Sequence, residues 1–378
     1  MKILFAGGGT AGHINPAIAV AGYIRERHPD AQLTYIGTKR GMESRLVPAA
    51  GIEFHTIDVE GFQRKLSLTN IKRNISAASK LLSASSHAKK LLLELKPDVV
   101  MGTGGYVSGP VLREAYKLGI KCCIHEQNAF AGKANKMLAP HMDTVMLAMP
   151  EAEKYFECQY KPVITGNPVR ESVINMKKDE ARKKLGLDSR PMILSFGGSL
   201  GARRINEAVS DVIAWHWQSG KYQHYHATGK YGVELMPRLL KEKGVDLNAE
   251  NVHITEYIDN MDVLLAAADL VICRSGAITI SELQAQGKPA VLIPSPNVAE
   301  NHQYFNAMTL VDKGAAELIE EKDLTAEKVV GTVKRLIEDP EKLREMSKAS
   351  HASAILDTNE RIYRVIMDLY TESQNTDK

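Results

Sequence analysis

The stretch VICRSGAITISELQAQGKPAVLIPSPNVAENHQ, residues 271–303, decides the fold class of this chain. Residues 271–273 are apolar and predict a short buried strand, and a tight turn follows at 274–277. Residues 279–286 predict a helix, which a glycine and a proline end, and a second apolar strand is expected over 290–293. Strand, loop, helix and strand in this order are typical of a parallel α/β sheet.

The turn of this stretch has the chemistry of a phosphate site. It places Gly276, free backbone N–H groups and the guanidinium of Arg274 at the start of a helix, a combination that favours a phosphate or pyrophosphate. Glu282, one turn into the helix, could accept two hydrogen bonds from a ribose diol. Alternatively, Glu282 only complements the helix dipole and Arg274 is a surface charge. Together with the polar residues 300–303 at the exit of the next strand, a sugar-nucleotide site is the better interpretation.

Length and composition describe an ordinary globular protein with room for two domains. The 378 residues are 44% hydrophobic and 25% charged, and the net charge of +3 gives no support for a nucleic-acid partner. No apolar run approaches the roughly 18 residues that span a bilayer, and the start of the chain lacks the apolar core of a signal peptide. Four cysteines form neither a disulfide framework nor a zinc pattern, so we expect a cytoplasmic protein.

A glycine-rich loop at 7–13, GGGTAGH, follows an apolar strand at 3–6. We expect the next helix to have Asn15 as its N-cap and Pro16 at its first position. The spacing matches the G-x-G-x-x-G fingerprint of dinucleotide sites, which requires an acidic residue about 20 residues further on. The next strand ends instead in Gly-Thr-Lys-Arg, residues 37–40, whose basic pair leaves an NADP site open.

His13, at the end of this loop, is a candidate general base near neutral pH. The alternative is a helix-capping or packed histidine. Two further loops follow predicted strands: 102–110, with four glycines before a helix, and 125–128, His-Glu-Gln-Asn. Both lie where parallel α/β sheets bind ligands, although either alone could be a tight turn.

Apolar runs separated by helical stretches predict two doubly wound parallel sheets. We place the first domain at 1–165, joined by a C-terminal helix at about 345–378, and the second at 166–344. The second domain opens as the first does, with a strand, glycines at 197–201 and Asn206 leading into a helix. The predicted strands are 3–6, 33–36, 53–57, 98–101, 121–124, 144–147, 162–165, 192–196, 223–227, 252–255, 270–273, 290–293 and 316–319.

Residues 61–95 mix basic and apolar positions along a predicted helix. Ile71, Lys72, Ile75 and Leu82 are the candidates for contact with an anionic membrane surface. The alternative is a helix that packs its leucines on the sheet and exposes its lysines. The sequence contains no aspartates two apart, no Walker loop and no HExxH, so we expect no metal, and kinase and zinc-hydrolase functions are excluded.

Eight motifs, spread in order over nearly the whole chain, resemble those of the peptidoglycan N-acetylglucosaminyltransferases in glycosyltransferase family 28. They are GGGTAGHINPAIAVA, VMGTGGYVSGPV, HEQNAFAGKANK, TGNPVR, SFGGSLGARRIN, EYID, CRSGAITISE and ENHQYFNA. The resemblance implies the GT-B fold, two Rossmann-like α/β domains that face a cleft. It implies an inverting transfer of GlcNAc from UDP-GlcNAc to the MurNAc 4-hydroxyl of lipid I, which gives lipid II without metal or cofactor. Its implied place is the cytoplasmic face of the cell membrane, as a peripheral protein with anionic lipids and cell-wall or division proteins as partners.

The resemblance also assigns roles to residues. His13 resembles the general base and Glu126 a possible assistant, while Gly104, Gly105 and Tyr106 match the acceptor side. Two departures are Leu200 and His302, each at a position where the family often has glutamine. The donor-binding positions are Thr10, Ala11, Gly12, Asn128, Arg170, Ser199, Ile258, Arg274, Ala277, Ile278, Thr279, Ile280, Ser281, Glu282 and Gln303.

Three alternative functions remain open from the residues alone. An NADP-dependent oxidoreductase is suggested by the first glycine loop, but it leaves residues 274–303 unexplained. A UDP-GlcNAc epimerase would have the same two-domain architecture and would turn over the donor without an acceptor. A protein that binds a sugar nucleotide without catalysis is the third.

Overall fold

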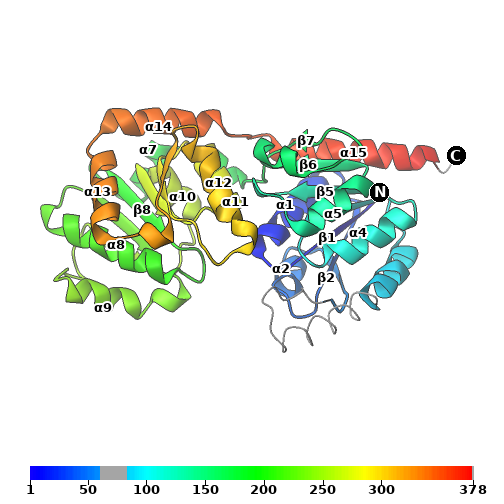
Figure 1. Cartoon of the computed structure of the whole chain (residues 1–378), viewed down its shortest axis with the longest axis horizontal. Coiled ribbons are helices and arrows are strands. Elements are labelled where there is room, and N and C mark those ends of the chain that lie inside the picture. The colour runs from blue at the N-terminus through cyan, green and yellow to red at the C-terminus, as the bar shows by residue number, and fades with distance from the viewer. Residues whose placement is uncertain (60–82, 377–378) are drawn as a thin grey trace. The chain divides into compact units, whose positions relative to one another are not determined.

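The computed structural model describes residues 1–59 and 83–376, which form two compact units (Figure 1). Unit 1 comprises Met1–Pro168 and Asp357–Lys378, and unit 2 comprises Val169–Leu356. Residues 345–356, which we expected in the first domain, lie in unit 2 because their helix packs on that unit and buries Met346 in its core.

Unit 1 is built on a seven-stranded sheet in the order β3-β2-β1-β4-β5-β6-β7, and all its strands are parallel. The order reverses between β1 and β4, so the sheet has its topological switch point there. The strands are β1 (Lys2–Gly7), β2 (Gln32–Gly37), β3 (Glu53–Thr56), β4 (Val99–Gly104), β5 (Lys121–Glu126), β6 (Thr144–Leu147) and β7 (Val163–Ile164).

Apolar clusters cover both faces of this sheet. One contains Ile14 and Val20 of the first helix and Ile362 and Ile366 of the last, and the other contains Val111 with residues of the helical segment 83–95. Figure 1 shows the last helix, in red, lying along unit 1. The helices are α1 (Ala11–Arg27), α2 (Glu43–Ala49), α4 (Ser108–Lys117), α5 (Lys133–Leu138) and α15 (Thr358–Thr376).

Unit 2 repeats the design with a six-stranded parallel sheet in the order β10-β9-β8-β11-β12-β13. Its switch point lies between β8 and β11. The strands are β8 (Met192–Phe196), β9 (Gln223–Ala227), β10 (Val252–Thr255), β11 (Leu270–Cys273), β12 (Ala290–Leu292) and β13 (Ala316–Leu318).

The helices of unit 2 pack on this sheet through a continuous core that includes Ile193, Val209, Leu240 and Val333. They are α6 (Glu171–Asn175), α7 (Lys178–Lys184), α8 (Arg203–His216), α9 (Leu235–Glu242), α10 (Met261–Ala267), α11 (Ala277–Ala285), α12 (His302–Val311), α13 (Ala326–Ile337) and α14 (Pro340–Ala352).

The predicted fold class is confirmed: both units are Rossmann-like parallel sheets, and every predicted strand is present. The predicted helix starts are wrong. α1 begins at Ala11 with Thr10 as N-cap, so Asn15 and Pro16 lie inside the helix, and Asn206 lies inside α8, which begins at Arg203. Each helix begins directly at its glycine loop, which the cap preferences of single residues did not indicate.

The candidate membrane residues Ile71, Lys72, Ile75 and Leu82 lie outside the described residues. Within the part of the chain that the structure describes, no helix has the length and apolar character needed to cross a membrane.

Candidate active site

The candidate residues of unit 1 meet at one edge of its sheet. The loops at 7–13, 104–106 and 126–128 follow β1, β4 and β5, which are neighbours in the sheet. The carboxyl ends of parallel strands share an edge, and ligands of such sheets bind there next to the switch point. The structure therefore brings His13, Gly104 to Tyr106 and Glu126 together, as the sequence predicted for the sheet edge.

His13 is the third residue of α1, and its ring lies between the two glycine loops. Its Nδ1 lies 3.1 Å from the carbonyl oxygen of Gly8 and 3.2 Å from Oγ1 of Thr10. A carbonyl can only accept, so this contact places the ring proton on Nδ1 and leaves Nε2 with its lone pair. Nε2 faces Gly104, where a Cβ would lie 3.2 Å away. In this tautomer Nε2 is the ring nitrogen that can accept a proton.

The two glycine loops touch through their backbones. Gly105 has φ of 79°, and a Cβ on it would lie 2.3 Å from the carbonyl oxygen of Gly8, so only glycine fits. The hydroxyl of Ser108 donates to the carbonyl of Ala6 at 2.8 Å and accepts from the N–H of Gly104 at 3.0 Å. The Tyr106 ring lies against Gly9. These contacts fix the predicted acceptor residues beside His13.

Glu126 is buried, and its carboxylate accepts four hydrogen bonds. Oε1 accepts from the backbone N–H and from the side-chain amide of Asn128, both at 3.0 Å. Oε2 accepts from the N–H of Gly132 and from the amide of Asn135, both at 2.9 Å. Since these donors occupy its lone pairs, the geometry favours a role in shaping the loop after β5. The predicted donor residue Asn128 is itself held by Glu126, which lies two residues before it in the chain.

Glu43 is a residue that the sequence analysis missed. It is fully buried, and its carboxyl group accepts from the N–H and hydroxyl of Thr38 at 3.1 and 2.7 Å. It also accepts from the N–H of Gly9 at 3.4 Å. A buried carboxyl group beneath the first glycine loop uses a donor that a pyrophosphate would need, which disfavours the NADP interpretation. Glu43 begins α2, three residues after the predicted basic pair, and no local motif indicates this contact.

The candidate donor residues of unit 2 also meet at the carboxyl edge of their sheet. The glycine loop at 197–201 follows β8, the turn at 274–276 follows β11, and the two strands flank the switch point. Gly276 is the N-cap of α11, and the residues 277–281 form its first turns. The first N–H groups of a helix have no partner within it, and this end of the helix dipole favours an anion.

Arg274 does not project freely into this edge. Its Nη1 donates to the carbonyls of Ile293 and Pro294 at 3.0 and 2.9 Å, and its Nη2 lies 2.7 Å from the Glu321 carboxylate. The guanidinium therefore ties β11 to the segment after β12. Arg274 lies at the predicted site. Its contacts, however, favour a role in holding the turn and not in touching a ligand.

Glu282, in contrast, lies beside another candidate donor residue. It points from α11 toward Arg170, with Oε1 and Nη2 3.8 Å apart, and only 16% of its side chain is exposed. Burial raises the pKa of Glu282, and the Arg170 charge partly opposes this effect. Within the described residues no donor hydrogen-bonds to the Glu282 carboxylate, so its oxygens can accept from hydroxyl groups.

The remaining donor positions follow the same edge. The side-chain oxygen of Gln303 accepts from the N–H of Ser295 at 2.9 Å. The backbone carbonyl of Gln303 accepts from the Ser275 hydroxyl at 2.7 Å, which links α12 to the turn after β11. Ser199 and Leu200 are exposed in the glycine loop, and Ile258 is buried after β10. His302 begins α12.

A buried row of side chains, the histidine chain, lies beneath the glycine loop of unit 2. Hydrogen bonds connect its members in sequence: His216 to His224 (2.9 Å), His224 to Ser195 (2.8 Å), Ser195 to His226 (2.9 Å) and His226 to Asn206 (3.1 Å). The Asn206 amide then donates to the carbonyl of Thr228 at 3.0 Å.

The histidine chain supports the glycine loop from below. Because the Asn206 amide donates to Thr228, its oxygen must accept from Nε2–H of His226, which leaves Nδ1 of His226 to accept from Ser195. Burial lowers the pKa of His216 and of His226 to about 4, so both rings are neutral in this pattern. Thr228 in turn contacts Gly201, on which a Cβ would lie 2.1 Å from the Thr228 carbonyl oxygen.

A solved structure matches the fold over nearly the whole chain. The chain is similar to the crystal structure of MurG from Acinetobacter baumannii, with a TM-score of 0.78 and 30% identity over 97% of this chain and 99% of that one. Two Rossmann-like parallel sheets with ligand loops at their carboxyl edges place the protein in the GT-B class of two-domain glycosyltransferases.

Sequence comparison narrows this class to a family. Residues 3–147 match the glycosyltransferase family 28 N-terminal domain, and residues 192–362 match the family 28 C-terminal domain. The chain belongs to glycosyltransferase family 28. It is 43% identical, over 98% of both chains, to the UDP-N-acetylglucosamine--N-acetylmuramyl-(pentapeptide) pyrophosphoryl-undecaprenol N-acetylglucosamine transferase of Acetivibrio thermocellus.

The UDP-GlcNAc 2-epimerase of Neisseria meningitidis shares the architecture, with a TM-score of 0.62 and 15% identity over 97% of this chain and 100% of that one. At this identity the likeness extends to the fold alone.

Proposed function

We propose that this protein transfers GlcNAc from UDP-GlcNAc to the MurNAc sugar of lipid I and so forms lipid II for peptidoglycan synthesis. The observation that carries the proposal is the near-full-length identity of 43% to a transferase of that name. The fold and the arrangement of His13, the glycine loops and Glu282 at the two sheet edges agree with it.

His13 acts as the general base in this proposal. The acceptor hydroxyl gives its proton to Nε2 while the hydroxyl oxygen attacks the anomeric carbon of GlcNAc, and the bond from that carbon to the diphosphate breaks. The Gly8 carbonyl stabilises the imidazolium that forms, because it accepts from Nδ1–H. Gly104, Gly105 and Tyr106 hold the acceptor beside this ring, and Glu126 keeps Asn128 and the loop after β5 in place.

Backbone groups stabilise the departing UDP. The N-terminus of α11 and the glycine loop at 197–201 offer N–H donors to the diphosphate, with Arg274 holding the turn. Glu282 accepts from the ribose hydroxyls, and the backbone at Ile258 meets the uracil. Gln303 contacts the GlcNAc, and Arg170, Ser199 and the first turns of α11 complete the donor site.

We also propose that the protein acts as a peripheral protein on the cytoplasmic face of the cell membrane, because its acceptor is anchored in lipid. Cell-wall or division proteins are its expected partners there, with consequences for cell shape and division.

The experiment measures release of UDP from UDP-GlcNAc with and without a soluble lipid I analogue, in EDTA. We expect release that depends on the acceptor and survives the chelator. Release without acceptor, together with a change of configuration at the sugar C2, would instead favour the epimerase. Failure of folded protein to release UDP in either condition would refute the transferase proposal.

A further inference from the structure

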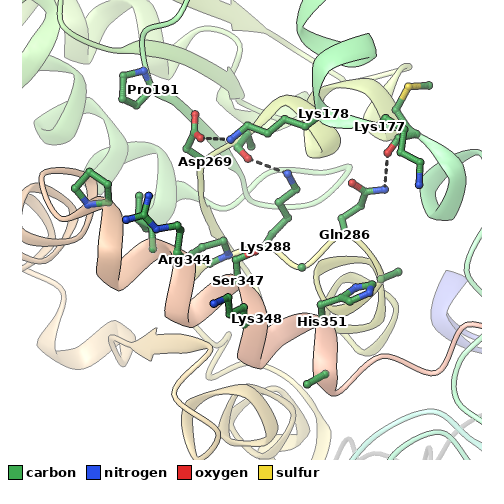
Figure 2. Close-up of a pocket in the computed structure, with 18 of the residues that line it drawn as sticks. Lys177, Lys178, Pro191, Asp269, Gln286, Lys288, Arg344, Ser347, Lys348 and His351 are labelled. Carbon is green, nitrogen blue, oxygen red and sulfur yellow. Dashed lines mark hydrogen bonds and ion pairs between the residues drawn. The ribbon is translucent and has the colours of Figure 1, made fainter.

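Unit 2 contains a cavity of about 770 Å³ that takes no part in the proposed reaction (Figure 2). Pro191, Asp269 and Pro289 line it, and they directly precede β8, β11 and β12. The cavity therefore opens at the amino edge of the sheet, whereas the donor loops leave the carboxyl edge. The five residues of β8, at about 3.3 Å per residue, separate the two edges by roughly 16 Å.

One wall of the cavity is a basic stripe on α14. Arg344, Ser347, Lys348 and His351 line it at the i, i+3, i+4 and i+7 positions of one helix face, as Figure 2 shows. The helix is held in place because the buried Ser350 donates to the carbonyl of Leu283 in α11 at 3.2 Å. The stripe is therefore a fixed surface of unit 2.

Cations dominate the lining. Lys177, Lys178, Lys288, Arg344 and Lys348 are five cationic side chains, and Asp269 is the only carboxylate that lines the cavity. Asp269 already pairs with Lys178 and with Arg182 and accepts from the N–H of Met192 at 2.8 Å. Arg344 pairs with Glu341 outside the cavity. For Lys177 and Lys348, no ion pair occurs within the described ranges 1–59 and 83–376.

Lys288 is buried in the floor of the cavity, with 5% of its surface exposed. Its ammonium group donates to the carbonyls of Ala266 and Ala268 at 2.7 and 2.9 Å, which uses two of its three N–H donors. Burial, with the positive charge of Lys178, lowers the pKa of Lys288 to about 7. An anion bound nearby would raise the pKa of Lys288 again and stabilise its charged form. The excess of positive charge in the lining therefore favours a negatively charged ligand.

We propose that this cavity binds an organic phosphate, with the phosphate between Lys288 and the basic stripe of α14 and an apolar portion against Ile174, Met176 and Leu343. The volume lies within the range of about 300–1,000 Å³ that is usual for small-molecule sites, and the apolar residues suit more than a bare ion. A soluble phosphate ester and the headgroup of an anionic phospholipid offer the same chemistry. The site is independent of the proposed glycosyl transfer.

The test uses two probes and two matched variants. The soluble probe is 1-naphthyl phosphate, titrated by calorimetry with UDP at saturation to fill the donor site, and 1-naphthol is its uncharged control. The second probe is sedimentation with vesicles of phosphatidylglycerol and phosphatidylcholine against vesicles of phosphatidylcholine alone. The cavity variant is Arg344→Glu with Lys348→Glu. The control variant, Lys328→Glu with Lys342→Glu, makes the same charge change in unit 2 at residues that do not line the cavity.

We expect the cavity variant to bind at least one charged probe about tenfold more weakly or worse, and the control variant to bind it as the wild type does. Loss for the soluble probe identifies a soluble phosphate ester as ligand, and loss for vesicles alone identifies a phospholipid headgroup. Equal loss in both variants, or no loss in either, would overturn the proposal. If the cavity variant does not fold, Arg344→Gln with Lys348→Gln gives the same comparison. None of these outcomes depends on transferase activity.

Discussion

Substitution of Glu282 by glutamine should weaken donor binding and leave the chemical step nearly intact. The change keeps the size of the side chain but removes its charge, and the lost pairing with Arg170 contributes little because that arginine is 58% exposed. A hydrogen bond to a charged group contributes about 1.5–3 kcal/mol. Glutamine retains one acceptor oxygen, so we expect a net loss of about 2–3 kcal/mol, or roughly a 30- to 150-fold rise in the donor KM.

The assay is the initial rate against UDP-GlcNAc concentration at saturating acceptor, with calorimetry of UDP as an independent measure. Because the ribose contact is the same in the ground and transition states, kcat should stay within about twofold of the wild type. Glu327→Gln, in the first turn of α13, is the matched control. A donor KM within about threefold of the wild type would refute the ribose role.

The pH dependence gives a second test of the same role. Burial raises the pKa of Glu282, so the wild-type carboxylate becomes protonated at a higher pH than an exposed glutamate does. The donor KM of the wild type should therefore rise as the pH falls toward that raised pKa. The glutamine variant should lack this rise, and the same rise in both proteins would assign it to another group.

Three further predictions follow from the geometry. His13→Ala should lower kcat by about 10²- to 10⁴-fold with little change in the donor KM, and initial rates that match the wild type would contradict its role as base. In the unfolded chain a histidine gains its proton near pH 6.5, whereas burial lowers the pKa of His226 in the folded protein to about 4. The free energy of unfolding in urea should therefore fall as the pH drops from 6.5 to 4. A constant value would contradict a neutral histidine chain. Gly201→Ala should lower the melting temperature more than Gly198→Ala, since both have positive φ but only the first adds a Cβ 2.1 Å from the Thr228 carbonyl oxygen, and equal shifts would count against that contact.

The fold was predictable because its strands are buried on both faces and so form apolar runs that glycine loops end. Runs such as residues 192–196 and 270–273 match their strands to the residue. Helix starts were not predictable in the same way. A single asparagine or proline indicates only a local preference for a helix start. The starts of α1 and α8 are set instead by the position at which the preceding strand and its glycine loop end.

The candidate site was predictable in place but not in contacts. The glycines and polar residues after β1, β4, β5, β8 and β11 indicate the sheet edge, because topology alone brings them together. The partners of individual side chains are set by distant parts of the chain. Glu321 lies 47 residues after Arg274, and no local pattern pairs them. Likewise, nothing near Glu43 in the sequence indicates that it reaches the N–H of Gly9.

The hydrogen bonds of three motif residues have a common role in the proposed mechanism. Arg274, Glu126 and Asn206 are polar residues of the motifs, yet in the structure each of them holds backbone in place: the turn after β11, the loop after β5 and the Thr228 segment against Gly201. Preorganised backbone donors stabilise developing charge without having to reorganise when the bond to the diphosphate breaks. The proposed transfer therefore depends on two layers, backbone N–H groups that meet the diphosphate and side chains that fix those groups. In this proposal His13 and Glu282 contact the substrates directly, with Arg170 beside Glu282 in the donor site.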